Sequence, residues 1–392
     1  MLLIIQPFQI PLKLKRKKIL FVIIALLFCL VGWYFIYQIP VKEKVIRVSS
    51  EEISGLINMD VSFEDYRFFD GTNLELSGLR IRTPYPKEDY RTVNAHHVDW
   101  INAKFKTVRI YNFDYLQLIR NKKFRASSIE ILNADIEVYR DKTLPEPPFK
   151  HQPQLASTLR KLKADVGIDT LFIRSSRVHY YEKTKYSEQP GILNFENMFA
   201  SGYNLTNNTE KLSVDPIFTL DVQAQLLGKA LINTQVLFDL SSEADFFKMS
   251  AKLAPFQADI LNQMIGGILP VEIGEGEFKG IHLNFKANED RSSGWVDFEY
   301  ENMKFEFTNP DGKGLKSFVS NKALALAIRT NNLKDSRNYR RGRIEFERRK
   351  DRFIFNYWWN SLKSGLINTM MTDAAKLLKL DEKAMEEPRE DN

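Results

Sequence analysis

The sequence predicts a mainly β protein: a single N-terminal transmembrane helix, then an elongated, curved antiparallel β-sheet with a few short helices and an amphipathic C-terminal helix. Residues 19–37 form an uncharged apolar run that is long enough to cross a bilayer. Beyond this run, apolar residues recur at every second position, which is typical of strands with one apolar face. Stretches with helical periodicity are few, and all but the last are short.

The predicted anchor has a clear orientation. At ~1.5 Å per residue, a helix over 19–37 would reach about 28 Å, close to the thickness of a bilayer core. Its N-terminal flank carries five bases and no acid (Lys13, Lys15, Arg16, Lys17 and Lys18). Positive flanks stay in the cytoplasm, so we expect everything after about residue 40 on the far side of the membrane. A cleaved signal peptide is the alternative, but residues 32–37 offer no small-x-small cleavage site.

The charge balance and the cysteine content bear on two questions, whether the protein binds nucleic acid and whether it contains disulfide bonds. The formal net charge is +6, but removing the five flanking bases leaves 51 basic against 50 acidic residues. The high pI is therefore explained by the orientation signal, and we expect no nucleic-acid partner. The single cysteine, Cys29, lies inside the predicted anchor, so the exported part has no disulfide and depends on burial for its stability.

Alternation is clearest in the second half of the chain. Residues 218–226 and 230–240 each carry apolar side chains at even positions, and Gly228-Lys229 between them predicts a hairpin turn. Residues 281–285 and 296–300 continue the pattern. At Glu301-Asn302 the apolar side chains change parity, which indicates a turn or a bulge. Earlier strands are predicted at 61–68, 74–81, 98–110 and 129–139.

Helical patterns and composition divide the chain further. Short helices are expected near 112–119, 155–162 and 260–265, and a longer amphipathic helix at 356–380. The segments are then a cytoplasmic basic N-terminus (1–18), the anchor (19–37), a membrane-proximal β-rich part (41–143), a Pro-rich linker (144–153), a distal β-groove part (154–355), the C-terminal helix (356–380) and a disordered acidic tail (381–392).

Motifs for catalysis are missing from the sequence. It contains no phosphate-binding GxxxxGK loop, no GxGxxG, no GxSxG and no HExxH. The five histidines are scattered, and most acids alternate with apolar residues, as expected on a solvated strand face. We therefore expect no enzyme, no metal site and no cofactor.

A basic cluster follows residue 334 and has two interpretations. Its bases include six candidates for contact with lipid head groups or an acidic partner: Arg340, Arg341, Arg343, Arg348, Arg349 and Lys350. Near an anionic membrane each base contributes ~1 kcal/mol of attraction. The alternative is a solubilised loop and hairpin edge, where Lys and Arg prevent aggregation. In either case these side chains would lie on the surface, where substitutions usually cost little stability.

Four stretches (128–141, 256–273, 294–304 and 346–359) give the chain a resemblance to a known family. Together with the anchor they resemble the AsmA-like proteins of bacterial envelopes with two membranes, which are grouped with TamB-type and chorein-type β-groove proteins. The resemblance implies a curved sheet folded into a trough, apolar inside and polar outside, that moves or organises lipids between membranes. It also implies the bacterial inner membrane as the location, single-pass, with the bulk of the chain periplasmic.

The functional expectation is therefore a lipid-handling protein without covalent chemistry, contributing to outer-membrane and envelope homeostasis. Its partners would be membrane lipids, phospholipid above all, with another envelope protein as a further candidate. The expected lipid-facing residues are Phe218, Leu220, Val222, Ile232, Val236, Phe238, Ile281, Leu283, Phe285, Val296, Phe298 and Tyr300. The alternative is an anchored scaffold that modulates assembly of outer-membrane proteins, in which the same residues form a sealed core.

Overall fold

The computed structural model describes residues 59–113, 117, 121, 123–162, 164–269, 271–307 and 327–377. The predicted anchor at 19–37, most of the helix expected near 112–119, and the acidic tail lie outside these residues. Among the described residues, no helix combines the length and the apolar character needed to cross a membrane.

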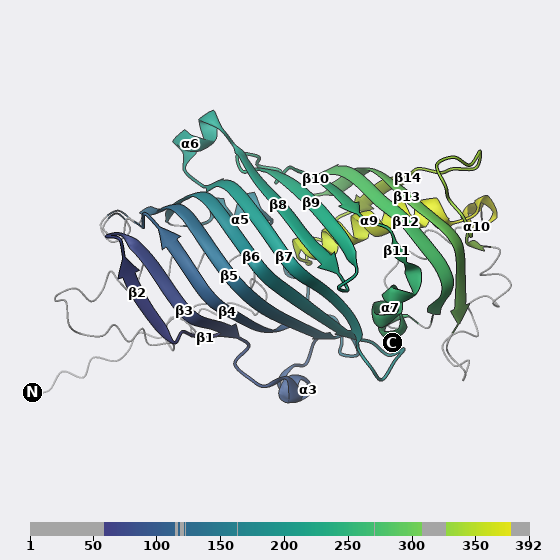
Figure 1. Ribbon diagram of the computed structural model, residues 1–392, viewed down its shortest axis with the longest axis horizontal. Helices are drawn as coiled ribbons and strands as arrows, with labels where there is room; N and C mark the ends of the chain where they lie inside the picture. Colours follow the sequence, from purple (N-terminus) through teal and green to yellow (C-terminus); the bar gives the residue numbers. More distant parts are fainter. Residues whose placement is uncertain are drawn as a thin grey trace, which may run out of the picture.

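A single large, curved and unclosed β-sheet dominates the described part of the chain (Figure 1). Twelve of its strands follow one hydrogen-bonded path, in the order β1-β3-β4-β5-β6-β7-β8-β9-β10-β12-β13-β14, while β2 pairs with β3 and β11 pairs with β12. The strands are β1 (Asp60–Ser62), β2 (Asp65–Phe69), β3 (Asn73–Arg82), β4 (Trp100–Tyr111), β5 (Lys123–Asp141), β6 (Asp165–Lys183), β7 (Gly191–Thr206), β8 (Ile217–Leu226), β9 (Ala230–Asp239), β10 (Phe247–Leu253), β11 (Phe256–Gln257), β12 (Val271–Ala287), β13 (Arg291–Phe307) and β14 (Gly342–Glu347).

The helices are short insertions, apart from one near the C-terminus. They are η1 (Lys87–Asp89), α3 (Tyr90–Val93), α5 (Leu155–Arg160), α6 (Thr209–Val214), η2 (Ala258–Leu261), α7 (Asn262–Ile268), α9 (Ile354–Met370) and α10 (Asp373–Leu377). The mainly β class and the short helices near 155 and 260 are confirmed. The single helix expected at 356–380 is wrong, because the helix ends at Met370. Met371 is extended and forms an isolated bridge with Ile328, after which Thr372 accepts a hydrogen bond from the amide of Ala375 at 3.2 Å.

The expectation of a purely antiparallel sheet is also wrong at one place. Strands β5 and β6 are parallel over their whole length, from the pair Lys123–Asp165 to the pair Asp141–Lys183. A parallel pair needs a crossover that returns to the start of the strand, and residues 142–164, which include the Pro-rich segment and α5, make that connection. Since β5 and β6 are neighbours in one sheet, this sheet runs continuously across the predicted linker.

A row of left-handed residues bends the long strands. Asn133, Ser175 and Asn197 have φ of 52°, 51° and 47°, and the strand pairings place them at the same level of β5, β6 and β7. Asn tolerates this conformation better than most residues. Each such residue shifts the pleat by one position, so buried side chains change from odd positions (Ile129) to even ones (Ile136) along β5. The apolar face therefore stays inside while the strand curves.

The second half of the sheet matches the predicted pattern closely. β8 and β9 form the expected hairpin, with Leu227 and Gly228 at positive φ in its turn. The parity change at Glu301-Asn302 is a bulge and not a turn, because β13 continues to Phe307 while Asn302 adopts φ of 53°. The predicted strands alternate between a buried face and a solvated one, as one-sided sheets do.

Helix α9 lies across the apolar face of the sheet (Figure 1) and contacts β13 and β14. Its backbone approaches β14 closely: a Cβ added to Gly342 would lie 2.2 Å from the carbonyl oxygen of Gly365. A Cβ added to Gly365 would lie 2.6 Å from a methyl group of Val296 and 2.8 Å from Ile344. Glycine at both positions lets the helix pack directly on the sheet.

We expect Gly365→Ala to destabilise the fold by about 1–3 kcal/mol, because the new methyl group overpacks the contact with Val296 and Ile344. Gly266→Ala in α7 is a matched control: nothing lies within 4 Å of its added Cβ, and alanine favours a helix. Urea denaturation followed by tryptophan fluorescence measures both. Equal stability of the two variants would contradict the close packing of α9.

Candidate functional site

The twelve predicted lipid-facing residues share one face of the sheet. The pairings place Phe218 opposite Phe238 and Phe238 opposite Phe247, so one aromatic row crosses β8, β9 and β10. Further along, Leu283 lies opposite Val296. The structure therefore brings these side chains together, as the alternation within each predicted strand indicates.

They do not have the same exposure. Eight are buried: Phe218, Val236, Phe238, Leu283, Phe285, Val296, Phe298 and Tyr300. Four are only half-buried: Leu220, Val222, Ile232 and Ile281. The twelve residues therefore do not line an open trough evenly.

Helix α9 covers much of the buried group. The ring of Trp358 lies 6.5 Å from that of Phe238, and the ring of Tyr357 lies 6.0 Å from that of Phe247. Ser361, itself buried, places its hydroxyl 2.8 Å from the hydroxyl of Ser292 on β13. The helix thus occupies the position in which a cargo was expected.

The four half-buried residues belong to a longer half-buried surface. Ile232 lies opposite Leu253, which in turn lies opposite Ile281, so three adjacent strands contribute to one apolar row. Half-buried Met249 on β10 adds to it. We call this set the apolar strip: Leu220, Val222, Ile232, Met249, Leu253 and Ile281. It is the least buried part of the predicted surface.

The first three bases of the predicted cluster have carboxylate partners. Arg341 donates two hydrogen bonds to Asp297, at 2.6 and 2.9 Å, and its guanidinium lies 4.4 Å from the ring centre of Trp295. Burial alone would raise the pKa of Asp297, but hydrogen bonds from Arg341 and a tyrosine outweigh it and lower this pKa. Arg340 pairs with Asp373 at 2.6 Å, whereas Arg343 pairs with Glu345 at 3.0 Å and stays exposed.

The last three bases hold the crossover between β5 and β6. The expectation that Arg348 is a surface residue is wrong: its side chain is 1 % exposed and lies 2.6 Å from a carboxylate oxygen of Glu289. It also donates a hydrogen bond to the carbonyl of Gln152 in the crossover. Arg349 pairs with Glu146 of the crossover at 2.9 Å. Lys350 contacts the crossover through its carbonyl, which accepts a hydrogen bond from the amide of Gln152 at 2.7 Å, while its ammonium group pairs with Asp290 at 2.6 Å.

The crossover makes further contacts that fix it to the same end of the sheet. Gln154 donates to the carbonyl of Asn288 at 3.0 Å, and the amide of Ser157 donates to Asp245 at 2.6 Å. These contacts tie the crossover to the loops that follow β9, β12 and β14. The bases near 350 therefore have a structural role, and contact of the cluster with lipid head groups stays a prediction.

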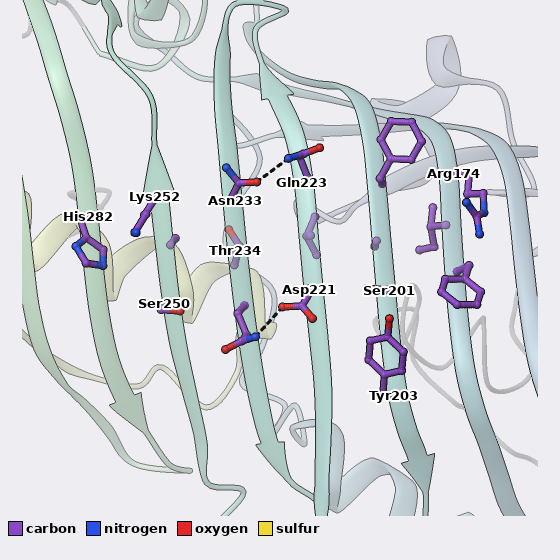
Figure 2. A pocket seen from close by; sticks show the side chains of 17 residues that line it. Arg174, Ser201, Tyr203, Asp221, Gln223, Asn233, Thr234, Ser250, Lys252 and His282 are labelled. Atoms are coloured by element: carbon purple, nitrogen blue, oxygen red, sulfur yellow. Dashed lines mark hydrogen bonds between the residues drawn. The ribbon is translucent and has the colours of Figure 1, made fainter.

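A second surface was missed by the sequence analysis. The polar face of the sheet carries a groove of about 580 Å³ that crosses β6, β7, β8, β9, β10 and β12 (Figure 2). Its polar residues alternate with apolar ones in the sequence, and this pattern by itself indicates only a solvated strand face. Three exposed or half-exposed aromatic residues, Phe172, Phe199 and Tyr203, were the available signal.

For metals, the part of the chain that the structure describes contains no group of three His, Cys, Asp or Glu side chains placed to hold an ion.

No protein-family model matches the sequence, and no curated protein is significantly similar to it. The resemblance to AsmA-like proteins therefore rests on the residue patterns alone.

We expect Arg348→Ala to lower the free energy of unfolding by about 3 kcal/mol, since the change leaves the partly buried Glu289 carboxylate without its nearest cation. Arg343→Ala, which removes an exposed base from the same segment, is expected to change it by less than about 0.5 kcal/mol. Urea denaturation measures both values. A neutral Arg348→Ala variant would show that the crossover is held without this side chain.

Proposed function

We propose that the protein is anchored in a bacterial inner membrane and binds lipid acyl chains in the periplasm on the apolar strip of its sheet. The observation that supports this is the strip itself: six apolar side chains on adjacent strands remain half-buried beside a well-covered core. Apolar side chains left partly in water are costly, and larger apolar surfaces of this kind are used for binding. The proposed activity is partition, without covalent chemistry or a cofactor.

The physical driving force is the removal of apolar area from water. An acyl chain laid along Val222, Ile232 and Ile281 would gain ~25 cal/mol for each Å² that it buries, or about 0.8 kcal/mol for each methylene group. The same contact covers the half-exposed side chains of the strip. Head groups would remain in water at the margin of the sheet. Phospholipid fits this arrangement because its chains and head group need opposite environments.

Helix α9 limits where the chains can lie. Because it packs on Phe238, Phe247 and Val296, the deeper part of the predicted trough is filled by protein. A lipid would therefore lie beside α9, on the strip, and not in the positions of Leu283 or Phe285.

The size of the sheet favours local handling over a complete bridge between membranes. The hydrogen-bonded path contains twelve strands. At ~4.8 Å between neighbouring strands, that path is about 50 Å long. Transfer over a longer distance would need a relay with another envelope protein.

A scaffold for assembly of outer-membrane proteins is the second candidate. The eight buried residues favour it, since they form a sealed core with α9 where the trough was expected to be open. The two functions differ in what touches the strip. A lipid handler presents it to acyl chains, and a scaffold presents it to another protein.

We expect a photo-crosslinking residue at Val222 or Ile232 to capture lipid, because both side chains belong to the apolar strip. The same probe at Gln223 or Asn233 should capture none, because neighbouring positions of a strand point to opposite faces. Mass spectrometry of the adducts from membranes measures this. Adducts to protein alone at Val222 and Ile232 would favour the scaffold.

The anchor gives a separate prediction. A reporter enzyme that is active only after export should be active when fused after Asn392, because the bases at 13–18 keep the N-terminus in the cytoplasm. A reporter that is active only in the cytoplasm, at the same fusion point, is the matched control. Activity of that control fusion would overturn the proposed topology while leaving the apolar strip untouched.

A further inference from the structure

The groove on the polar face is built from two parallel rows of side chains. One row contains Phe172, Ser201, Asp221, Gln235 and Ser250, and the other contains Arg174, Phe199, Gln223, Asn233, Lys252 and His282. Between them, Val222 and Thr234 supply backbone to the floor while their side chains turn to the other face. From β6 to β12 the groove crosses five strand spacings, or about 24 Å at ~4.8 Å each.

Hydrogen bonds along each row hold its polar groups in place (Figure 2). Gln223 donates to Asn233 at 2.8 Å in one row, and Gln235 donates to Asp221 at 2.8 Å in the other. A primary amide has two N–H donors and an oxygen that accepts twice, so one bond uses only part of its capacity. The middle of the groove therefore offers oriented groups that both donate and accept.

The two ends of the groove differ. Toward the β6 end, Phe199 and Tyr203 of β7 are 44 % and 43 % exposed, so both rings are open to solvent. At the other end lie Lys252 and His282 (Figure 2). Burial, followed by the nearby charge of Lys252, lowers the pKa of His282, so its imidazole is neutral at pH 7 and can donate and accept.

Several ligand classes do not fit these residues. A nucleic acid needs cations along its backbone, but Arg174 pairs with Glu130 at 3.0 Å and the Asp221 carboxylate lies within the groove. A lipid chain needs continuous apolar walls, whereas the middle of this groove is lined by the amides of Gln223, Asn233 and Gln235. An added peptide strand needs a free sheet edge, whereas β7, β8, β9 and β10 are paired on both sides.

We propose that this groove binds an oligosaccharide. Sugar hydroxyls donate and accept, as the amides of Gln223, Asn233 and Gln235 do, and the C–H face of a sugar ring packs on exposed aromatic rings such as Tyr203. Lys252 places a cation at one end, which selects a saccharide with an acidic substituent there. The site lies on the face opposite the apolar strip and is independent of lipid binding.

The test uses the full chain in detergent micelles against immobilised oligosaccharides of neutral, N-acetylated and uronic-acid types. At least one type should retain the chain, with the acidic type preferred. The double variant Gln223→Ala, Asn233→Ala and the single variant Tyr203→Ala should each weaken that binding at least tenfold, while Lys252→Ala should remove the preference for acidic sugars.

Lys248→Ala is the matched control, because this exposed lysine lies on the same face of β10 as Lys252 but outside the groove. The Lys248→Ala variant should bind saccharide as tightly as the original chain does. Circular dichroism of each variant verifies folding. The proposal is overturned if no saccharide type retains the chain, or if the groove variants bind like Lys248→Ala. It is also overturned if free phosphatidylglycerol vesicles displace the chain from every sugar, since a simple anion contact would then explain the binding.

Discussion

The packing of α9 on the apolar face is the interaction on which the rest of this structure depends. A single sheet with one apolar face cannot leave that face in water, and no second sheet covers the residues that the structure describes. In the second half of the sheet the helix supplies the cover with Tyr357 and Trp358, and Gly342 and Gly365 allow its backbone to approach. Where the cover is incomplete, the half-buried strip remains, and the proposed lipid site follows from it.

The parallel pair of β5 and β6 imposes a second constraint. Its crossover must travel the length of a long strand, and it is held at the far end by Arg348, Arg349 and Lys350. A cluster of bases that suggested membrane contact thus joins two distant parts of the chain. Charge on a surface segment does not by itself indicate a charged partner, because ion pairs within the fold use the same residues.

The two faces of the sheet have different chemistry although they alternate along the same strands. Val222 belongs to the apolar strip, whereas Asp221 and Gln223 line the polar groove. Under the two proposals, one strand contacts an acyl chain on one side and a hydroxyl-rich ligand on the other. A substitution on one face leaves the other face in place, which makes the two proposals separable by experiment.

The sequence by itself determined the strand-rich class, the β8–β9 hairpin and the shared face of Phe218, Phe238 and Leu283, because alternation with period two is a local property. It also located the parity change at Asn302, because the apolar positions on either side of the bulge change from even to odd. Only the tertiary structure decided which of these side chains are sealed, because that depends on where α9 docks. The parallel pairing, the burial of Arg348 and the polar groove depend in the same way on strands and loops far apart in sequence, whose relative positions no local pattern encodes.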